Sequence, residues 1–273
     1  MAGRAAAALL AIGDSSTVAL VTQLADGLGI PLAERGRRSR LPVVALVGAT
    51  TVSDAEVRAG PPSPASVFAE PPSASWFEEV PGGAPAGAAL YAAWSPAVAL
   101  AGREIAAAGP LRHVDVRVRQ PRGTGFPAAL ALAAWTLAGQ DVGALVALAR
   151  GRARLTGSAV VAEVDGTASP LPEWSLQAAS DHSVVRLELA PTVSFERDGE
   201  PVPLGDPAGE DPAVTAARHL GLLGFLDDLR SGALLDPRRW PRGAHPGWGR
   251  TVERLLVAHT ASLSRSGAAV PTT

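Results

Sequence analysis

The sequence predicts an α/β unit followed by an α+β unit, the second built on an antiparallel sheet and ending in helices. Three features of the sequence lead to this prediction. Two continuously apolar segments, 42–48 and 65–69, have the length and composition of parallel strands buried on both faces. Segment 113–120 alternates valine with polar residues, which is typical of an antiparallel strand with one solvated face. The end of the chain carries two helical patterns, which are expected to close the second unit.

The first hundred residues contain the elements of a doubly wound α/β unit in order. An apolar run over 4–13 ends in glycine and predicts the first strand. Apolar residues at helical spacing over 17–28 predict the helix that follows it. The apolar runs at 42–48 and 65–69 then supply further buried strands, so this part of the chain alternates strands with helices or loops.

The middle of the chain changes to a pattern of helices and half-buried strands. A helix is predicted over 95–108, with Pro96 in its first turn. The alternating strand at 113–120 follows, and then an alanine-rich helix over 127–138. Further strands are predicted at 145–149, 159–164 and 184–189.

Turn and cap signals organise the rest of the chain. Asp198-Gly199 predicts a hairpin turn between two short strands. Asp211 followed by proline predicts the start of a helix that runs to Gly232. A second helix is predicted from the apolar residues spaced over 252–263.

Composition excludes several kinds of chemistry. The 273 residues suffice for two domains, and the 24 basic and 26 acidic residues give a net charge of −2, which predicts neither nucleic-acid nor anionic-membrane partners. With 0 cysteines, disulfides, thiolate nucleophiles and iron–sulfur ligation are impossible. No lysine occurs, so Schiff-base catalysis and lysine general acids are impossible as well. The five histidines do not stand at metal-ligand spacing, so no metal site is expected.

The sequence also predicts the location of the protein. It contains no uninterrupted apolar stretch of about 18 residues, the minimum for a membrane span. The apolar run over 5–12 is better explained as a buried first strand than as an export signal, because no small-residue cleavage site follows it. A cytoplasmic location is therefore expected.

Four segments, taken in order, resemble the glucose–fructose oxidoreductase / inositol dehydrogenase (Gfo/Idh/MocA) family. Segment 65–74 (Ala-Ser-Val-Phe-Ala-Glu-Pro-Pro-Ser-Ala) is similar to the family's strand that ends in Glu-Lys-Pro. Segment 91–98 (Tyr-Ala-Ala-Trp-Ser-Pro-Ala-Val) resembles its strand followed by a helix that opens with x-Pro-Ala-Val. Segment 111–120 corresponds to the first strand of the family's second domain, and 223–232 with 251–264 resembles its closing helix pair.

The resemblance implies a specific domain organisation and activity. Residues 1–95 would form a shortened Rossmann-like domain, and residues 96–273 an open antiparallel-sheet domain with C-terminal helices. The family consists of NAD(P)-dependent oxidoreductases, which implies NAD or NADP as cofactor and a sugar-like or secondary-metabolite substrate. It also implies a homo-oligomer formed through the sheet domain.

The phosphate-binding turn departs from the family's Gly-x-Gly-x-x-Gly/Ala pattern. Segment 13–18 is Gly-Asp-Ser-Ser-Thr-Val, so only the first glycine is present. The ribose contact of a dinucleotide fold comes about 20 residues later, where Glu34 is followed by several arginines. These residues would contact a ribose or a 2′-phosphate, or they form a solvated basic turn, and the sequence favours the second interpretation. The predicted cofactor contacts are Gly13, Ser15, Ser16, Glu34, Arg35 and Pro71.

The catalytic positions of the family are also altered. The family's lysine corresponds to Pro71, and its Asp/His/Asp set corresponds to Thr124, Ala128 and Ala131, none of which can transfer a proton. Tyr91, the single tyrosine, is the best remaining acid, with Glu70 one strand away. The predicted catalytic residues are therefore Tyr91 and Glu70.

The predicted substrate contacts lie near the expected domain junction. Arginines there could hold an anionic substrate and a tryptophan could line its pocket, although an exposed ion pair and a core tryptophan explain the same residues. These predicted contacts are Trp94, Arg119, Arg122 and Thr124.

Two functional hypotheses remain open. The first is a diverged oxidoreductase that reduces a C=O or C=N bond, or runs the reverse reaction, without the usual lysine. The second is a catalytically inactive member of the fold that binds a ligand or a paralogous subunit. The four family-like segments in order support the first hypothesis, which is the main prediction. The simultaneous loss of the glycine turn, the lysine and the Asp/His set supports the second, so the two are nearly level.

Overall fold

The chain divides into two structural units, and each of them is built from two separate segments. The computed structural model describes residues 5–13, 16–48, 57, 62–70, 84–120, 125–138, 140–206 and 208–272. The first unit comprises Met1–Trp94 with Gly221–Arg250, and the second comprises Ser95–Leu220 with Thr251–Thr273. Segment 221–250 therefore belongs to the first unit, although it follows the second unit's strands in the sequence. The first boundary lies within a residue of the expected one after residue 95.

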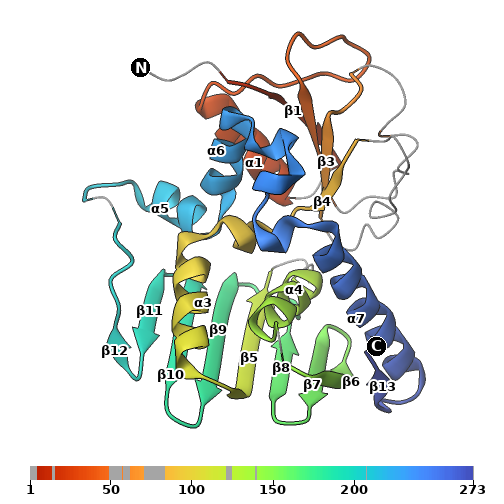
Figure 1. Ribbon diagram of the computed structural model, residues 1–273, viewed down its shortest axis with the longest axis vertical. Coiled ribbons are helices and arrows are strands. Elements are labelled where there is room, and N and C mark those ends of the chain that lie inside the picture. Colours follow the sequence, from red (N-terminus) through yellow and green to blue (C-terminus); the bar gives the residue numbers. More distant parts are fainter. Residues whose placement is uncertain are drawn as a thin grey trace. The chain divides into compact units, whose positions relative to one another are not determined.

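A four-stranded parallel sheet forms the centre of the first unit (Figure 1). Its strands are β1 (Ala8–Ile12), β2 (Val43–Val47), β3 (Ser66–Ala69) and β4 (Ala86–Ala88), and they lie in this order across the sheet. All three strand pairs are parallel, as expected for continuously apolar strands. Helix α1 (Ser16–Gly27) connects β1 to the segment before β2.

Both faces of this sheet are buried. One face forms an apolar cluster that contains Leu10, Ala45 and Val67 together with Val57. The returning helix α6 (Leu222–Ser231) contacts α1 and β1, and the Arg230 carbonyl accepts a 2.9 Å hydrogen bond from the Ala6 amide. Three short 3-10 helices complete the returning segment: Ala233–Leu235, Pro237–Arg239 and Arg242–Ala244.

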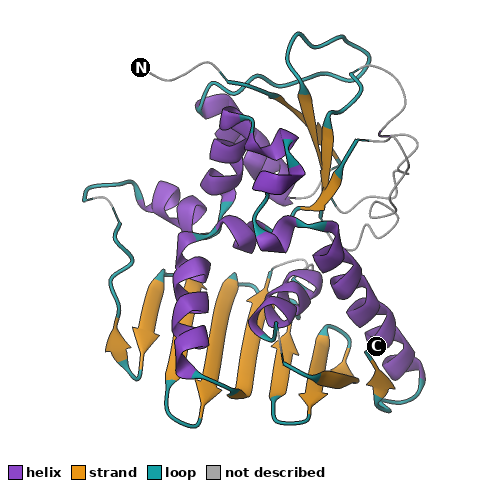
Figure 2. Ribbon diagram, in the orientation of Figure 1, coloured by secondary structure: helices purple, strands orange, loops and turns teal. Residues whose placement is uncertain are grey.

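A nine-stranded sheet forms the centre of the second unit, in the order β12-β11-β10-β9-β5-β8-β7-β6-β13. Its strands in sequence order are β5 (Leu111–Arg119), β6 (Val142–Ala149), β7 (Arg152–Gly157), β8 (Val161–Asp165), β9 (Glu173–Ser180), β10 (Val184–Ala190), β11 (Ser194–Arg197), β12 (Glu200–Pro201) and β13 (Val270–Pro271). The helices are α3 (Pro96–Ala108), α4 (Phe126–Thr136), α5 (Pro212–His219) and α7 (Pro246–Ser264), the last of which begins in the first unit. Figure 2 colours these elements by type.

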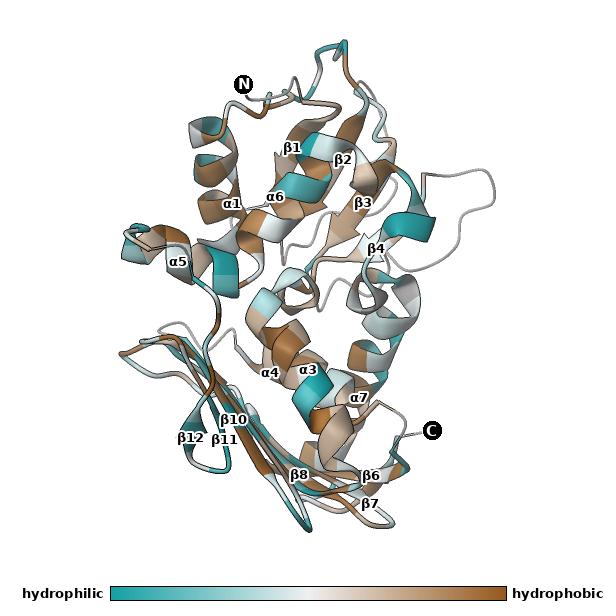
Figure 3. Ribbon diagram, turned by 60° about the vertical axis from the view of Figure 1, so that its left-hand side comes forward, coloured by the Kyte–Doolittle hydropathy of each residue, from teal (hydrophilic) through white to brown (hydrophobic). Residues whose placement is uncertain are grey.

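Among the residues that the structure describes, helices cover one face of the nine-stranded sheet and leave the other face uncovered. Figure 3 views this sheet nearly edge-on and shows α3, α4 and the second-unit part of α7 on the same side. In β5, Val114, Val116 and Val118 are buried, whereas Asp115 and Arg117 lie on the other face. The alternation of the sequence therefore corresponds to one covered and one uncovered face, as predicted.

The predicted fold class is confirmed, with local differences. The central strand β5 pairs with β8 in parallel, so the second sheet is mixed rather than wholly antiparallel. Strands at 152–157 and 173–180 were not predicted. The helix expected from Asp211 to Gly232 is two helices, because Gly221 adopts a left-handed φ of 83° between them. The hairpin turn at 198–199 is confirmed, with a positive φ at both residues.

No described helix is long and apolar enough to span a membrane.

Candidate functional site

The carboxyl ends of the parallel strands bring several predicted site residues to one edge of the first unit. Gly13 directly follows β1, Gly48 follows β2 and Glu70 follows β3. Ligands of open α/β sheets bind at this edge, because the chain leaves each strand there in a loop. Three separate segments therefore contribute to one candidate site.

The described residues on either side of the turn after β1 have two features that favour binding of a dinucleotide phosphate. Gly13 has a φ of 95°, a backbone conformation that favours glycine, and α1 begins at Ser16. The first amides of a helix are free to bind an anion, and the helix dipole favours negative charge there. Gly48 is buried at the end of β2 and donates a 2.8 Å hydrogen bond to the Ile12 carbonyl. Gly13, Gly48 and the start of α1 are therefore suited to bind a dinucleotide. Asp14, Ser15 and Pro71 lie outside the described residues.

The predicted ribose-contacting residues lie in a solvated turn. Leu32 forms an isolated parallel bridge with Leu9, so the segment before Glu34 runs along the outer edge of β1. Glu34 and Arg35 are exposed. The Glu34 carboxylate forms a 2.9 Å ion pair with Arg37, three residues later, and both side chains are largely exposed.

Glu70 and Tyr91 are brought together by the adjacent parallel strands β3 and β4. Glu70 follows β3, and Tyr91 opens the 3-10 helix η2 (Tyr91–Trp94) shortly after β4. The Tyr91 hydroxyl is buried and has no hydrogen-bonding partner within the part of the chain that is described. Burial raises the pKa of the Tyr91 phenol well above its ordinary value of 10.0, and the negative charge of Glu70 raises it further. Tyr91 therefore stays protonated at neutral pH.

An aromatic cluster packs against the Tyr91 ring. The Tyr91 and Phe225 ring centroids are 5.7 Å apart in an edge-to-face arrangement. Phe225 also packs against Phe68 and Trp94 at 5.6 and 5.2 Å, and Trp240 packs against Phe68 at 4.7 Å. Such edge-to-face pairs stabilise a core beyond the area they bury.

Trp94, a predicted substrate contact, is tied into this cluster. Its indole Nε1–H donates a 2.9 Å hydrogen bond to the Asp228 carboxylate of α6. A Cβ on Gly224 would lie 2.7 Å from the Trp94 carbonyl, so only glycine permits this approach of α6. The sequence analysis missed Asp228, and no local signal could have found it, because it lies 134 residues from Trp94.

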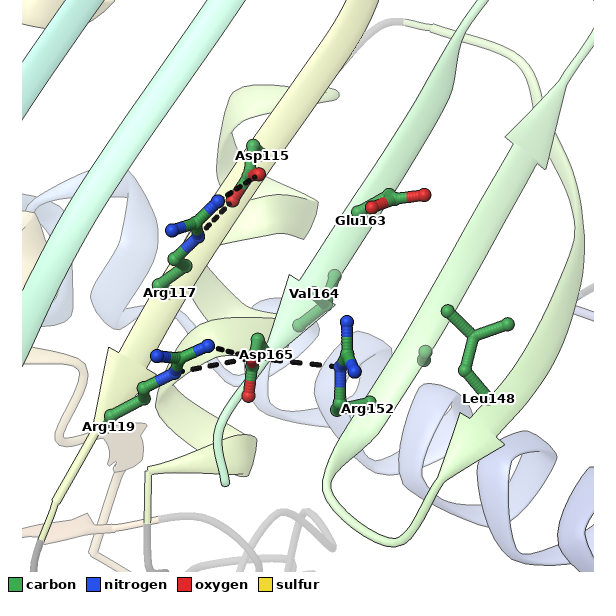
Figure 4. A pocket seen from close by; sticks show the side chains of 9 residues that line it. Asp115, Arg117, Arg119, Leu148, Arg152, Glu163, Val164 and Asp165 are labelled. Carbon is green, nitrogen blue, oxygen red and sulfur yellow. Dashed lines mark hydrogen bonds and ion pairs between the residues drawn. The ribbon is translucent and has the colours of Figure 1, made fainter. Parts of the chain in front are cut away.

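Arg119, another predicted substrate contact, lies on the uncovered face of the second unit's sheet. Its guanidinium donates hydrogen bonds to Asp165 and Glu173, the latter at 3.2 Å. Arg152 lies 3.6 Å from the same Asp165 carboxylate (Figure 4). Arg119 is therefore paired with two acids in this structure. Arg122 and Thr124 lie outside the described residues.

Asp165 organises the ion pairs of this face. Its Oδ1 accepts hydrogen bonds from the Thr167 amide at 3.0 Å and from the Thr167 hydroxyl at 2.7 Å. Burial opposes its ionisation, but the hydrogen bonds from Arg119 and Thr167 prevail and lower its pKa to about 2. The pocket around it holds three arginines, Arg117, Arg119 and Arg152, and three acids, Asp115, Glu163 and Asp165. The sequence Asp-Gly-Thr at 165–167 was a turn signal that the sequence analysis did not use.

Helix α4 carries alanine at two positions where the family has catalytic residues. Ala128 and Ala131 lie on α4, and Ala131 is buried. Trp135 near its end packs so closely on α3 that a Cβ on Gly102 would lie 2.6 Å from the indole. Within the described ranges, no group of three or more histidines and acids could hold a metal ion.

Comparisons with known proteins identify the fold. No protein-family model matches the sequence, and no curated protein does. Among solved structures, an inositol dehydrogenase homologue from Azotobacter vinelandii complexed with NAD+ matches with a TM-score of 0.65 at 14% identity, over 98% of both chains. Apo scyllo-inositol dehydrogenase from Lactobacillus casei matches with a TM-score of 0.65 at 10% identity, over 100% of this chain and 99% of that chain. GenD2 from gentamicin A biosynthesis, complexed with NAD, matches with a TM-score of 0.66 at 14% identity, over 99% and 97%.

The chain thus has the fold of inositol dehydrogenases and related Gfo/Idh/MocA-type oxidoreductases across nearly its whole length. The resemblance predicted from four sequence segments is confirmed at the level of the fold.

Proposed function

We propose that this protein is a diverged NAD(P)-dependent oxidoreductase that acts on a sugar-like or secondary-metabolite substrate without the usual catalytic lysine. The observation that carries the proposal is the carboxyl edge of the parallel sheet. There a glycine turn with positive φ, a helix N-terminus and an acid–phenol pair occur together in a dehydrogenase fold. Solved neighbours with this fold were crystallised with NAD.

The dinucleotide would be held by the first strand–helix turn. Gly13, Ser15 and Ser16 would contact the pyrophosphate, and Pro71 would lie against the nicotinamide in place of the family's lysine. Glu34 or Arg35 would contact the ribose, depending on whether NAD or NADP binds. When bound, the dinucleotide would donate or accept the hydride.

The chain's own residues would handle the proton. Reduction of a C=O or C=N bond needs one proton on the heteroatom, and oxidation returns it. The Tyr91 hydroxyl would donate this proton, and the Glu70 carboxylate beside it would take part in the transfer. Because the hydroxyl is buried, we expect substrate binding to uncover it.

The proposed substrate remains a sugar-like or secondary-metabolite compound. Solved structures with this fold include a scyllo-inositol dehydrogenase and a protein of gentamicin A biosynthesis, which supports this proposal. Trp94, Arg119, Arg122 and Thr124 remain the proposed substrate contacts. Of these, Arg119 would have to exchange an acid partner for the substrate.

The Tyr91→Phe variant tests the assignment of the proton donor. Turnover of NADH with a panel of keto-sugars and imines is expected to fall by about 10²–10⁴-fold, the usual contribution of a general acid. The stability of the variant should be nearly unchanged, because the hydroxyl it removes is buried without a partner. Glu200→Gln, an exposed change on β12, serves as the control and should keep full turnover. Unchanged turnover in Tyr91→Phe would refute the assignment.

A second candidate function is supported by the burial of the Tyr91 hydroxyl and by the absence of any lysine. The chain would then be an inactive subunit that binds a ligand, a paralogue or a second copy through its sheet domain. The uncovered sheet face would be the contact surface. Co-purification with an active paralogue, together with no NADH or NADPH binding by the isolated chain, would favour this function.

A further inference from the structure

The first unit carries a groove in which only Glu34 has a role in the proposed oxidoreductase function. It has a volume of about 660 Å³ and lies along the outer side of β1. Its apolar lining includes Leu28, Leu32 and Leu41, and its polar lining includes Arg37, Arg38 and Arg40. A groove of this volume is the size of a small-molecule site.

Topology places most of this groove at the amino-terminal edge of the sheet. Ala8 is the first residue of β1, Leu28 follows the end of α1, and Leu41 lies just before β2. The proposed dinucleotide edge is the opposite one, where Gly13 and Glu70 follow their strands. Glu34 lines the groove too, but its carboxylate is paired with Arg37.

The groove combines an apolar surface with excess positive charge. Leu28 and Leu32 are 41% and 43% exposed, which is high for two neighbouring leucines. Three arginines face a single acid, and that acid is paired with Arg37. Arg38 and Arg40 form no ion pair with any other residue that the structure describes. An occupant should therefore bring negative charge to the arginines and an apolar body to the leucines.

We propose that this groove binds a small amphiphilic anion, a carboxylate or phosphate monoester attached to an apolar chain or ring. The carboxylate or phosphate would accept hydrogen bonds from Arg38 and Arg40, since guanidinium groups bind such anions in a bidentate manner. The apolar body would cover Leu28 and Leu32. A protein partner fits less well, because a specific protein interface needs a much larger surface than one groove supplies.

Titration calorimetry with decanoate, below its micellar concentration, tests the proposal on the full chain. Decanoate and decyl phosphate should bind, whereas decanol and decyltrimethylammonium should not. The double variant Arg38→Gln/Arg40→Gln should bind decanoate at least about tenfold more weakly, as expected when charge-assisted hydrogen bonds are lost. Leu32→Gln should also weaken binding, and Arg265→Gln, an exposed arginine of the second unit, should not.

Three results would overturn the proposal. Equal binding of decanol would show that charge does not matter. Displacement of decanoate by NADH would make the groove part of the dinucleotide site, so NADH is included as a competitor. Binding to phosphatidylglycerol vesicles without binding to free decanoate would indicate a membrane surface instead. Because Arg38 and Arg40 are both exposed, the double variant should fold, and its circular dichroism spectrum should match that of the wild type. If the double variant unfolds, the binding of decanoate by Leu32→Gln alone tests the proposal.

Discussion

Tyr91 is a spectroscopic probe of the proposed active site. It is the single tyrosine of the chain, so its ionisation can be observed without interference from another phenol. In the folded protein, burial and the nearby Glu70 charge raise its pKa. A group with a raised pKa in the folded state stabilises the protein below its ordinary pKa, and this contribution is lost as the pH rises above that value.

An alkaline titration of the phenolate absorbance band tests this environment. The native protein should show no phenolate near pH 10, and the band should appear only well above that pH or together with unfolding. In Glu70→Gln the band should appear at lower pH, because the negative charge is gone. A wild-type transition centred near the ordinary value of 10.0 would contradict the buried position of the hydroxyl.

Asp165 contributes to stability with the opposite pH dependence to Tyr91. Its pKa is lowered from 3.8 to about 2 in the folded protein, so the stability it contributes is present above about pH 4 and is lost as the pH falls toward 2. The difference from the ordinary value corresponds to about 2 kcal/mol. Asp165→Asn should therefore lower the free energy of unfolding by about 2 kcal/mol at neutral pH and flatten its decline in acid.

Urea unfolding from pH 7 to pH 2 measures this effect. Asp181→Asn is the matched control, because the Asp181 carboxylate pairs with Arg112 on an exposed part of the same sheet. The control should unfold like the wild type at neutral pH. Equal stability of wild type and Asp165→Asn at pH 7 would show that the ion pairs around Asp165 only offset the cost of its burial.

At the scale of the elements, close approaches decide where small residues are needed. Gly125 precedes α4, and a Cβ there would lie 1.8 Å from the Val118 carbonyl oxygen of β5. Helix α4 can approach the sheet only because this side chain is missing. At Gly143 of β6, by contrast, an added Cβ would have no neighbouring atom within 4 Å.

Gly125→Ala should therefore destabilise the protein by about 1–3 kcal/mol, because backbone must shift to admit the methyl group. Gly143→Ala should be neutral or slightly stabilising, since it restricts the unfolded chain and meets no neighbour. Thermal unfolding of the two variants against the wild type distinguishes these outcomes. A Gly125→Ala variant as stable as Gly143→Ala would contradict the packing of α4 against β5.

Short sequence patterns, such as apolar runs and helix caps, correctly predicted the elements whose residues all lie in a similar environment. Strand β2 is apolar throughout and β3 is apolar except for Ser66, because both of their faces are buried, and the Ser95 hydroxyl caps α3 by accepting a 3.1 Å hydrogen bond from the Val98 amide. Strands β7 and β9 were missed. Only two residues of each strand are buried, Ala153 and Leu155 in β7 and Leu176 and Ala178 in β9, so their apolar residues are too few to stand out.

At the scale of the whole molecule, long-range contacts lay beyond prediction from sequence. The four family-like segments sufficed for the fold class, since each preserves a strand or helix boundary. The return of segment 221–250 to the first unit depends on contacts such as Asp228 with Trp94 and the Ala6 amide with Arg230, which join residues far apart in the chain. The meeting of Glu70 and Tyr91 was predictable, because neighbouring parallel strands end at the same edge.

The altered phosphate-binding turn suggests a variant that should reduce dinucleotide affinity without unfolding the protein. Ser16 is the first residue of α1, and an aspartate there would interact favourably with the helix dipole. The same negative charge would repel a pyrophosphate. Gln23→Asp, at an exposed position further along α1, adds an equal charge away from the turn and serves as the control.

Calorimetric titration of the wild type, Ser16→Asp and Gln23→Asp with NADH and NADPH tests whether this protein binds a dinucleotide at the turn after β1. We expect the wild type and Gln23→Asp to bind one of the two dinucleotides and Ser16→Asp to bind it at least about tenfold more weakly. No heat of binding to wild type with either dinucleotide at millimolar concentration would contradict the account.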